Sequence, residues 1–215
     1  WDLPTRIFHW ALTVLVGCSF TTGTIGGDWM PWHLRSGYAI LTLVAFRLAW
    51  GVFGSDTARF AGFLRGPRRV AEYARLTLAG RHPAGVGHNP LGGWMVVAML
   101  AALAFQAATG LFSDDEIATQ GPLAVKVSNA LVSRMSHLHD VGRWIVAGLV
   151  VLHVAAIATY RWAWGVRLAG AMVTGWTQAP HGMPQPRLRS PTLAAILVAA
   201  AAAAVYALVE IYPMR

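Results

Sequence analysis

The chain alternates between long apolar runs and shorter polar connections. Five of these runs have the length of about 20 residues that a helix needs to cross a bilayer core of roughly 30 Å. They predict five membrane-spanning helices at residues 7–25, 33–53, 91–112, 138–160 and 192–209. The pattern therefore predicts an all-α protein, an integral membrane helical bundle. Residues 123–135 are mildly amphipathic and predict a short helix lying on the outer membrane surface.

The composition agrees with a membrane protein. Of the 215 residues, 56% are hydrophobic and only 12% are charged, which is too apolar for a soluble domain of ordinary composition. The formal net charge is +8, but the basic residues fall in particular connections between the apolar runs instead of forming one patch. We therefore expect membrane lipid, and no nucleic acid, among the partners of the chain.

The distribution of the basic residues predicts the orientation of the spans. The connection at residues 54–90 carries six arginines and the one at 161–191 carries four. The turn at 26–32 has none, and the connection at 113–137 opens with Asp114, Asp115 and Glu116. The positive-inside rule then places the N-terminus in the cytoplasm and the C-terminus on the outer side of the membrane.

Histidines inside the predicted spans are the candidate chemistry. Cys18 is the only cysteine, so an intramolecular disulfide is impossible, and the chain has no C-x-x-C-H motif for a covalent c-type haem. Ionisable groups within a membrane helix cost free energy and indicate function. Four of the eight histidines lie within the spans: His9, His33, His139 and His153.

The spacing of these histidines predicts two pairs. His139 and His153 are 14 residues apart, so they differ by about 40° in direction and about 21 Å in height along one helix. By depth, His33 pairs with His139 on the outer side and His9 pairs with His153 on the inner side. His137 points about 160° away from His153 and is excluded. Each pair matches the two axial imidazoles of one b-type haem, so we predict two haems inside the helical bundle.

Two other interpretations of the histidines stay open. Each histidine alone is equally well explained as a hydrogen-bonded interior residue. A zinc or copper site is the other interpretation, but it needs three or four ligands at one depth, whereas these histidines divide two and two.

Arginines near the histidines are candidate partners of the haem propionates. Arg47 lies 14 residues after His33, at the inner level, and Arg6 lies near His9. Arg35 and Arg143 are the corresponding candidates on the outer side. The alternative for each is snorkelling to the lipid headgroups. Glycines near the histidines leave room for flat rings, although close helix packing explains them equally well: Gly37, Gly142 and Gly148.

A quinone site is a weaker prediction. His88 and Asn89 stand at the cytoplasmic entrance to the third span, where they are candidates for hydrogen bonds to a quinone carbonyl. Capping of that helix, or a contact with a propionate, explains the two residues equally well.

Several short stretches resemble the bacterial cytochrome b561 family, in the branch similar to the cytochrome b subunits of nickel-iron hydrogenases. The likeness lies in residues 6–10 (RIFHW), 47–54 (RLAWGVFG), 58–60 (ARF), 87–92 (GHNPLG) and 109–112 (TGLF), together with the four histidines. The resemblance implies a di-haem four-helix domain over residues 1–176, with the four histidines as axial ligands. Residues 177–215 then form a cytoplasmic linker and a fifth transmembrane helix outside that core.

The resemblance also implies exchange of electrons with quinone and with a partner redox protein. The chain is then either an electron-transfer protein or an oxidoreductase subunit. We expect transfer between the quinone pool and a periplasmic partner such as a c-type cytochrome, which the acidic residues 114–116 would steer unless they simply form a solvated turn.

Three alternatives to this function stay open. The first is the membrane haem subunit of a hydrogenase-type oxidoreductase, and the second is a non-redox transporter or anchor. The third is a superoxide oxidase that delivers electrons to quinone, for which an outer funnel of cations is expected from Arg35, Lys126, Arg134 and Arg143.

Overall fold

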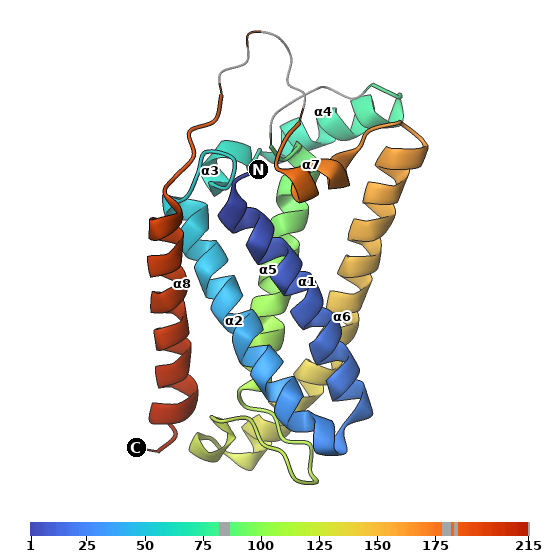
Figure 1. Cartoon of the computed structure of the whole chain (residues 1–215). Helices are drawn as coiled ribbons and strands as arrows, with labels where there is room; N and C mark the ends of the chain where they lie inside the picture. Colours follow the sequence, from blue (N-terminus) through green and yellow to red (C-terminus); the bar gives the residue numbers. More distant parts are fainter. Residues whose placement is uncertain (82–86, 178–181, 183–184, 215) are drawn as a thin grey trace.

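The computed structural model describes residues 1–81, 87–177, 182 and 185–214 and confirms five helices of membrane-spanning length. They are α1 Leu3–Ile25, α2 Met30–Phe53, α5 Pro90–Gly110, α6 Asn129–Trp162 and α8 Pro191–Tyr206, and the span that α8 begins continues to Ile211. They run side by side along the long axis of the molecule (Figure 1). The chain is an all-α integral membrane bundle.

Shorter elements close the two ends of the bundle. The end of the bundle at which the chain starts is called the N-terminal end below, and it holds α3, α4 and α7 (Figure 1). The chain finishes at the opposite end, called the C-terminal end. The three elements span Phe60–Phe63, Pro67–Leu78 and Leu168–Thr174. Three short helical segments lie elsewhere: η1 Gly27–Trp29, η2 Ala124–Lys126, and the π-helical η3 Ala207–Ile211 that continues α8.

Side-chain caps explain where the long helices begin. Asp2 accepts a hydrogen bond from the Thr5 N–H at the start of α1, and Asn89, Ser128 and Ser190 do the same at α5, α6 and α8. Such caps satisfy backbone N–H groups that have no partner within the helix. A proline in the first turn of α1, α2, α5 and α8 fits a position that needs no N–H donor.

The predicted surface helix at residues 123–135 is wrong. Only Ala124–Lys126 form a short 3₁₀ turn, and from Asn129 the chain is already part of α6, which is 34 residues long. The cap at Ser128 starts a helix that meets no proline or glycine before Gly142. Because adding a residue to an existing helix costs far less than nucleating a separate one, a single long helix forms.

The core is built around α2. Trp50, Val44 and Phe46 of this helix are almost fully buried, and they form one cluster with Phe8 of α1 and Leu100 of α5. The Trp50 indole N–H donates to the Asp2 carboxylate over 3.0 Å, so the cap of α1 is also anchored to the core.

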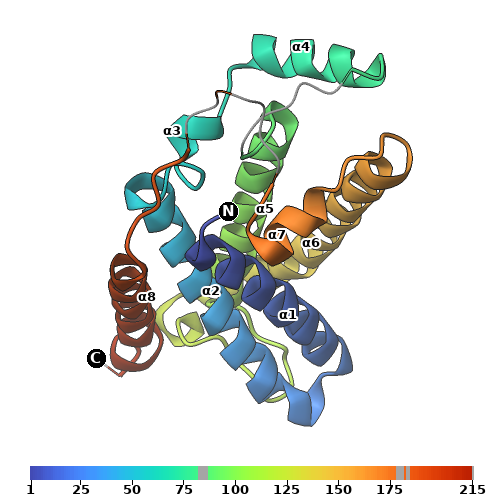
Figure 2. The same ribbon diagram turned by 45° about the horizontal axis from the view of Figure 1, so that its top comes forward.

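The fifth span, α8, packs along α2 on the outside of the four-helix arrangement, as the view in Figure 2 shows. Ala194 of α8 is buried in the cluster around Trp50, and small side chains of this kind let helices approach closely. Near the C-terminal end, Val205 and Val209 pack against Leu111 and Leu123. The helix therefore covers α2 and holds the loop that follows α5.

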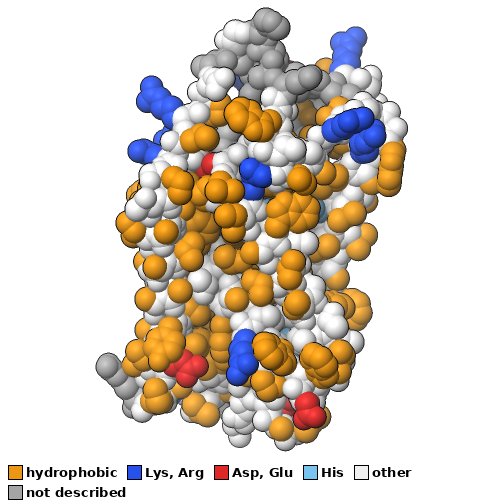
Figure 3. Space-filling model, in the orientation of Figure 1, with side chains coloured by type: hydrophobic (Ala, Val, Ile, Leu, Met, Phe, Trp, Pro, Cys, Tyr) orange, Lys and Arg blue, Asp and Glu red, His pale blue; other side chains and the backbone are white. Residues whose placement is uncertain are grey.

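The surface agrees with a membrane environment. On the face drawn in Figure 3, hydrophobic side chains cover the middle of the molecule, and charged side chains lie toward its two ends. Large apolar side chains stay exposed on the outward faces of the spans, for example Val14, Val151 and Ile196. In water such a surface would drive association, whereas in lipid it is solvated.

The double role of Asp2 gives a test of the fold. We expect Asp2→Ala to lower the free energy of unfolding by about 2 kcal/mol, because it removes a helix cap and leaves a buried indole N–H unpaired. The measurement is the loss of helical circular dichroism with denaturant in detergent micelles. Asp28→Ala, which removes an exposed carboxylate in η1, is the control and should change little. Equal stability of both variants would contradict the anchoring role.

Candidate functional site

The bundle interior brings the four histidines together in two pairs. His9 of α1 faces His153 of α6, with 6.4 Å between the ring centroids. His33 of α2 faces His139 of α6 at 5.9 Å. The first pair lies nearer the N-terminal end and is called the inner pair; the second is the outer pair. Along α6 the two levels are separated by about 21 Å, the rise of 14 helical residues.

Backbone carbonyls hold both rings of the outer pair. His33 Nδ1 lies 2.9 Å from the carbonyl oxygen of Ser19, and His139 Nδ1 lies 2.9 Å from that of Gln106. Because a carbonyl only accepts, each Nδ1 must carry the hydrogen. The lone pair then resides on Nε2, the tautomer in which histidine binds a metal with its other nitrogen fixed by a hydrogen bond.

Two glycines, missed as site residues by the sequence analysis, make room for these rings. A Cβ atom at Gly23 would lie 2.6 Å from His33 Nδ1, and one at Gly110 would lie 2.8 Å from His139 Cε1. Both contacts are far too short for a side chain. The sequence did contain a signal for Gly23. This glycine follows His9 by 14 residues and therefore lies on the same face of α1 as His9.

The three glycines singled out from the sequence differ in their surroundings. Gly37, one turn after His33, has open space where a Cβ would lie, which suits a flat ring. Gly142 is packed against the Gln106 side chain. Gly148 is exposed on α6 and likewise has no described atom near its Cβ position.

Unpaired polar atoms gather near the inner pair. Within the described part of the chain, His9 Nδ1 is buried without a hydrogen-bond partner, and so are both terminal nitrogens of the Arg47 guanidinium. Arg47 is almost fully buried in α2 and packs over the Phe60 ring at 5.0 Å. The Asp2 carboxylate attracts Arg47 electrostatically, but no described residue accepts a hydrogen bond from its terminal nitrogens. Buried donors without an acceptor are costly, so this arrangement fits a further anionic group beside Arg47.

His88 lies against the same region, outside the spans. Its ring packs between those of Trp1 and Phe63, with centroid distances of 4.5 and 4.4 Å. Burial, reinforced by the charges of Arg47 and His153, lowers the pKa of His88 to about 3. The ring is therefore neutral at physiological pH, and its buried Nδ1 has no hydrogen-bond partner among the residues that the structure describes.

Asn89 is engaged in the fold. Its Oδ1 accepts from the Gly92 N–H at 2.7 Å and caps α5, while its Nδ2 donates to the Tyr160 hydroxyl at 3.4 Å. The capping alternative thus accounts for Asn89. A quinone contact from His88 and Asn89 stays a prediction.

The other arginines predicted near propionates have protein partners. Arg6 donates to the carbonyls of Met172 and Val173 at the end of α7. Arg143 forms an ion pair with Asp140 at 2.8 Å, but its Nε is buried and unpaired. Exposed Arg35 packs over Trp32. The propionate role of all three stays a prediction.

The other two cations of the expected outer funnel, Lys126 and Arg134, are exposed. Lys126 packs over the Tyr212 ring, and Arg134 lies on α6.

The acidic stretch at the C-terminal end builds its own turn. Asp115 Oδ1 accepts hydrogen bonds from the N–H groups of Ile117, Ala118 and Thr119. Asp114 accepts from the Glu116 N–H and from the Gln120 side chain. The two aspartates are thus explained by the turn, and steering of a partner by this stretch stays a prediction.

The histidine pairs suit haem better than a small metal site. Within the described residues, no three of His, Cys, Asp or Glu gather in one place, as zinc requires. Two imidazoles bonded at about 2 Å to opposite faces of one iron have ring centroids about 6 Å apart, which matches both pairs. The unpaired His9 nitrogen, the unpaired Arg47 guanidinium and the open space at Gly37 also fit an anionic, flat group.

Comparison with known proteins supports the same conclusion. A family model described as prokaryotic cytochrome b561 matches residues 1–175, most of the chain. The chain belongs to the prokaryotic cytochrome b561 family. As a member, the chain is a membrane b-type cytochrome that takes part in electron transfer. The family binds haem b. The likeness to hydrogenase cytochrome b subunits is consistent with the name of the family. Neither a curated protein nor a solved structure matches the chain.

The close approach at Gly23 gives a test of the site in this cytochrome b561 protein. We expect Gly23→Val to displace the His33 ring and to lower the haem content of the purified protein. Gly17→Val on the same helix is the matched control, because nothing lies near its Cβ position. The measurement is haem per chain by the pyridine haemochrome spectrum. Equal haem content in the two variants would contradict the tight fit of His33 against α1.

Proposed function

We propose that this cytochrome b561 protein carries electrons across the inner membrane between the quinone pool and a periplasmic redox protein, such as a c-type cytochrome. The observation that carries the proposal is the pairing of histidines from α1 and α2 with two histidines of α6 at two levels of the bundle. Each pair would hold one haem b, and the haems would supply the one-electron chemistry when bound.

In this proposal the side chains around each pair have distinct tasks. His9 and His153 would hold a haem at the inner level, and His33 and His139 would hold one at the outer level. Arg47 would balance a propionate of a haem at the inner level, since its guanidinium is buried and its terminal nitrogens have no hydrogen-bond acceptor among the described residues. The carbonyls of Ser19 and Gln106 orient the outer imidazoles and raise their basicity as ligands.

The proposed orientation follows from charge. The N-terminal end carries the basic connections that include α4 and the segments on both sides of α7, so this end faces the cytoplasm. The inner pair then lies near the cytoplasmic side, where quinone exchanges electrons close to His88. The outer pair lies near the periplasm, within reach of a soluble partner.

A second candidate differs only in the outer partner. The likeness to hydrogenase cytochrome b subunits favours a role as the membrane haem subunit of a hydrogenase-type oxidoreductase. The two candidates separate on purification from mild detergent extracts. A permanent subunit brings a large iron-sulfur protein with it in fixed ratio, whereas a partner of a c-type cytochrome is recovered alone and binds that cytochrome reversibly.

Sealed vesicles test the transmembrane path. With haem-loaded protein in quinone-free liposomes, we expect an impermeant reductant outside to reduce ferricyanide trapped inside. His153→Ala should lower this rate at least about tenfold, because it breaks the inner level of the path while leaving the outer level intact. His137→Ala, which removes an exposed histidine of the same helix, is the control. Transfer by His153→Ala at the wild-type rate would contradict the proposal.

A further inference from the structure

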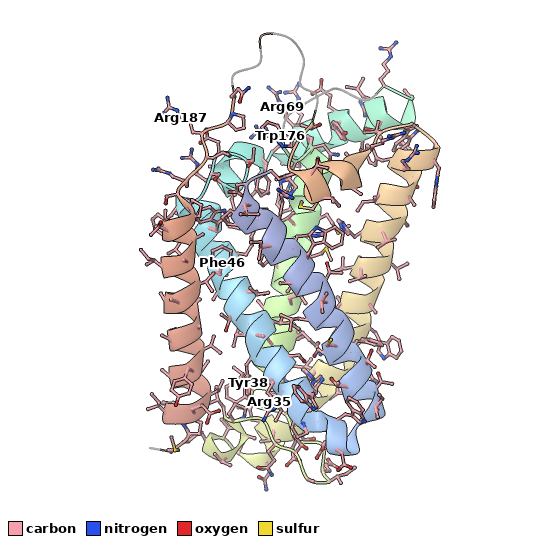
Figure 4. All side chains as sticks on the ribbon, in the orientation of Figure 1. Arg35, Tyr38, Phe46, Arg69, Trp176 and Arg187 are labelled. Atoms are coloured by element: carbon pink, nitrogen blue, oxygen red, sulfur yellow. The ribbon has the colours of Figure 1, made fainter. Side chains whose placement is uncertain are left out.

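A basic crevice lies where the segment before α8 meets the turn between α2 and α3. It has a volume of about 290 Å³ and is lined by Asp56, Arg59, Arg187, Leu188 and Arg189. Because α2 ends at Phe53 and α8 begins at Pro191, the crevice lies level with the ends of two membrane spans. That is the depth at which lipid headgroups meet the protein. Figure 4 shows Arg187 on this segment, at the same end of the molecule as Arg69 of α4.

The walls of the crevice are fixed by hydrogen bonds. The Asp56 N–H donates to the Arg187 carbonyl at 3.1 Å, and the Arg187 N–H donates to Asp56 Oδ2 at 2.9 Å. The Arg189 N–H donates to Ser55 Oγ at 3.0 Å. Ser55 itself is fully buried. The two segments, more than 130 residues apart in the chain, therefore form one preorganised wall.

The charge of the crevice is positive. Three guanidinium groups stand against one carboxylate, and that carboxylate is already paired with Arg59 and with the Arg187 N–H. The side chains of Arg187 and Arg189 are exposed, and among the described residues they have neither a hydrogen bond nor an ion pair. The N-terminus of the 16-residue helix α8 follows directly and adds its positive dipole end.

Apolar side chains lie next to these charges. Leu188 lines the crevice itself and is 64% exposed. Val52 and Phe53 are each 59% exposed on the last turn of α2, directly before the turn that forms the crevice wall. A ligand that suits both features has an anionic head and apolar chains, which distinguishes a phospholipid from a soluble anion.

We propose that this crevice binds the phosphate headgroup of an anionic phospholipid. Basic pockets at the cytoplasmic ends of transmembrane helices recognise such headgroups through charge. The arginines of α4 differ in kind, because Arg68 and Arg69 are exposed on a helix surface and do not line this crevice. The proposal rests on the crevice alone and is independent of the haem assignment.

Lipid binding to the purified, haem-loaded protein tests the proposal. Native mass spectrometry would follow titration with dioleoyl phosphatidylglycerol or dioleoyl phosphatidylcholine. We expect one phosphatidylglycerol to bind at least about tenfold more tightly than phosphatidylcholine. Because each arginine contributes to attraction of anionic lipid, Arg187→Gln with Arg189→Gln should weaken phosphatidylglycerol binding by about 30-fold.

Two further variants control for charge and folding. Arg68→Gln with Arg69→Gln removes the same charge from α4 and should leave the affinity within about twofold of wild type. Arg187→Lys with Arg189→Lys keeps the charge and should keep the preference for phosphatidylglycerol. This variant tests the role of the charge even where the glutamine pair folds poorly.

Three results would overturn the proposal. They are equal affinity for the two lipids, an equal loss in the α4 variant, and complete displacement of phosphatidylglycerol by millimolar inorganic phosphate. The last result would assign the crevice to a soluble anion.

Discussion

The facing of imidazoles across the bundle interior is the interaction on which the rest of the structure depends. Ionisable groups within a membrane helix cost free energy and indicate function. Here α6 carries two histidines on one face, and α1 and α2 each bring one histidine to the same level, with ring centroids 6.4 and 5.9 Å apart. A group held by both rings of each pair would fix the relative heights of these three helices. The facing of the rings also explains why Gly23 and Gly110 have no side chain where the outer rings pass.

The elements around the histidines support this arrangement at both ends. At the N-terminal end, Asp2 joins the start of α1 to Trp50 in the core, and Arg6 joins it to α7. At the C-terminal end, α8 packs against the loop that follows α5. Membership in the cytochrome b561 family gives the arrangement its meaning, since haem b is the group that this family holds.

Much of the fold could be predicted from sequence because a bilayer imposes a simple length rule on helices. The five spans, and the pairs of histidines that the structure brings together, follow from apolar length and from the helical repeat. The surface helix at residues 123–135 failed because amphipathicity does not show whether two helical stretches join. The hydrogen bonds of Arg6 to α7 and of Asn89 to Tyr160 depend on segments distant in sequence, which no local pattern reveals. Likewise, only the packed helices reveal that Arg47 is buried and that no described residue accepts from its terminal nitrogens.

The most direct test of the central claim is a count of haems. Reduced-minus-oxidised spectra with haem quantification would be recorded for the wild type, His139→Ala and His153→Ala. The account predicts two haems per chain in the wild type and one in each variant, with a different spectral component lost in each. A colourless wild-type protein, or a single haem that survives both substitutions, would contradict the account.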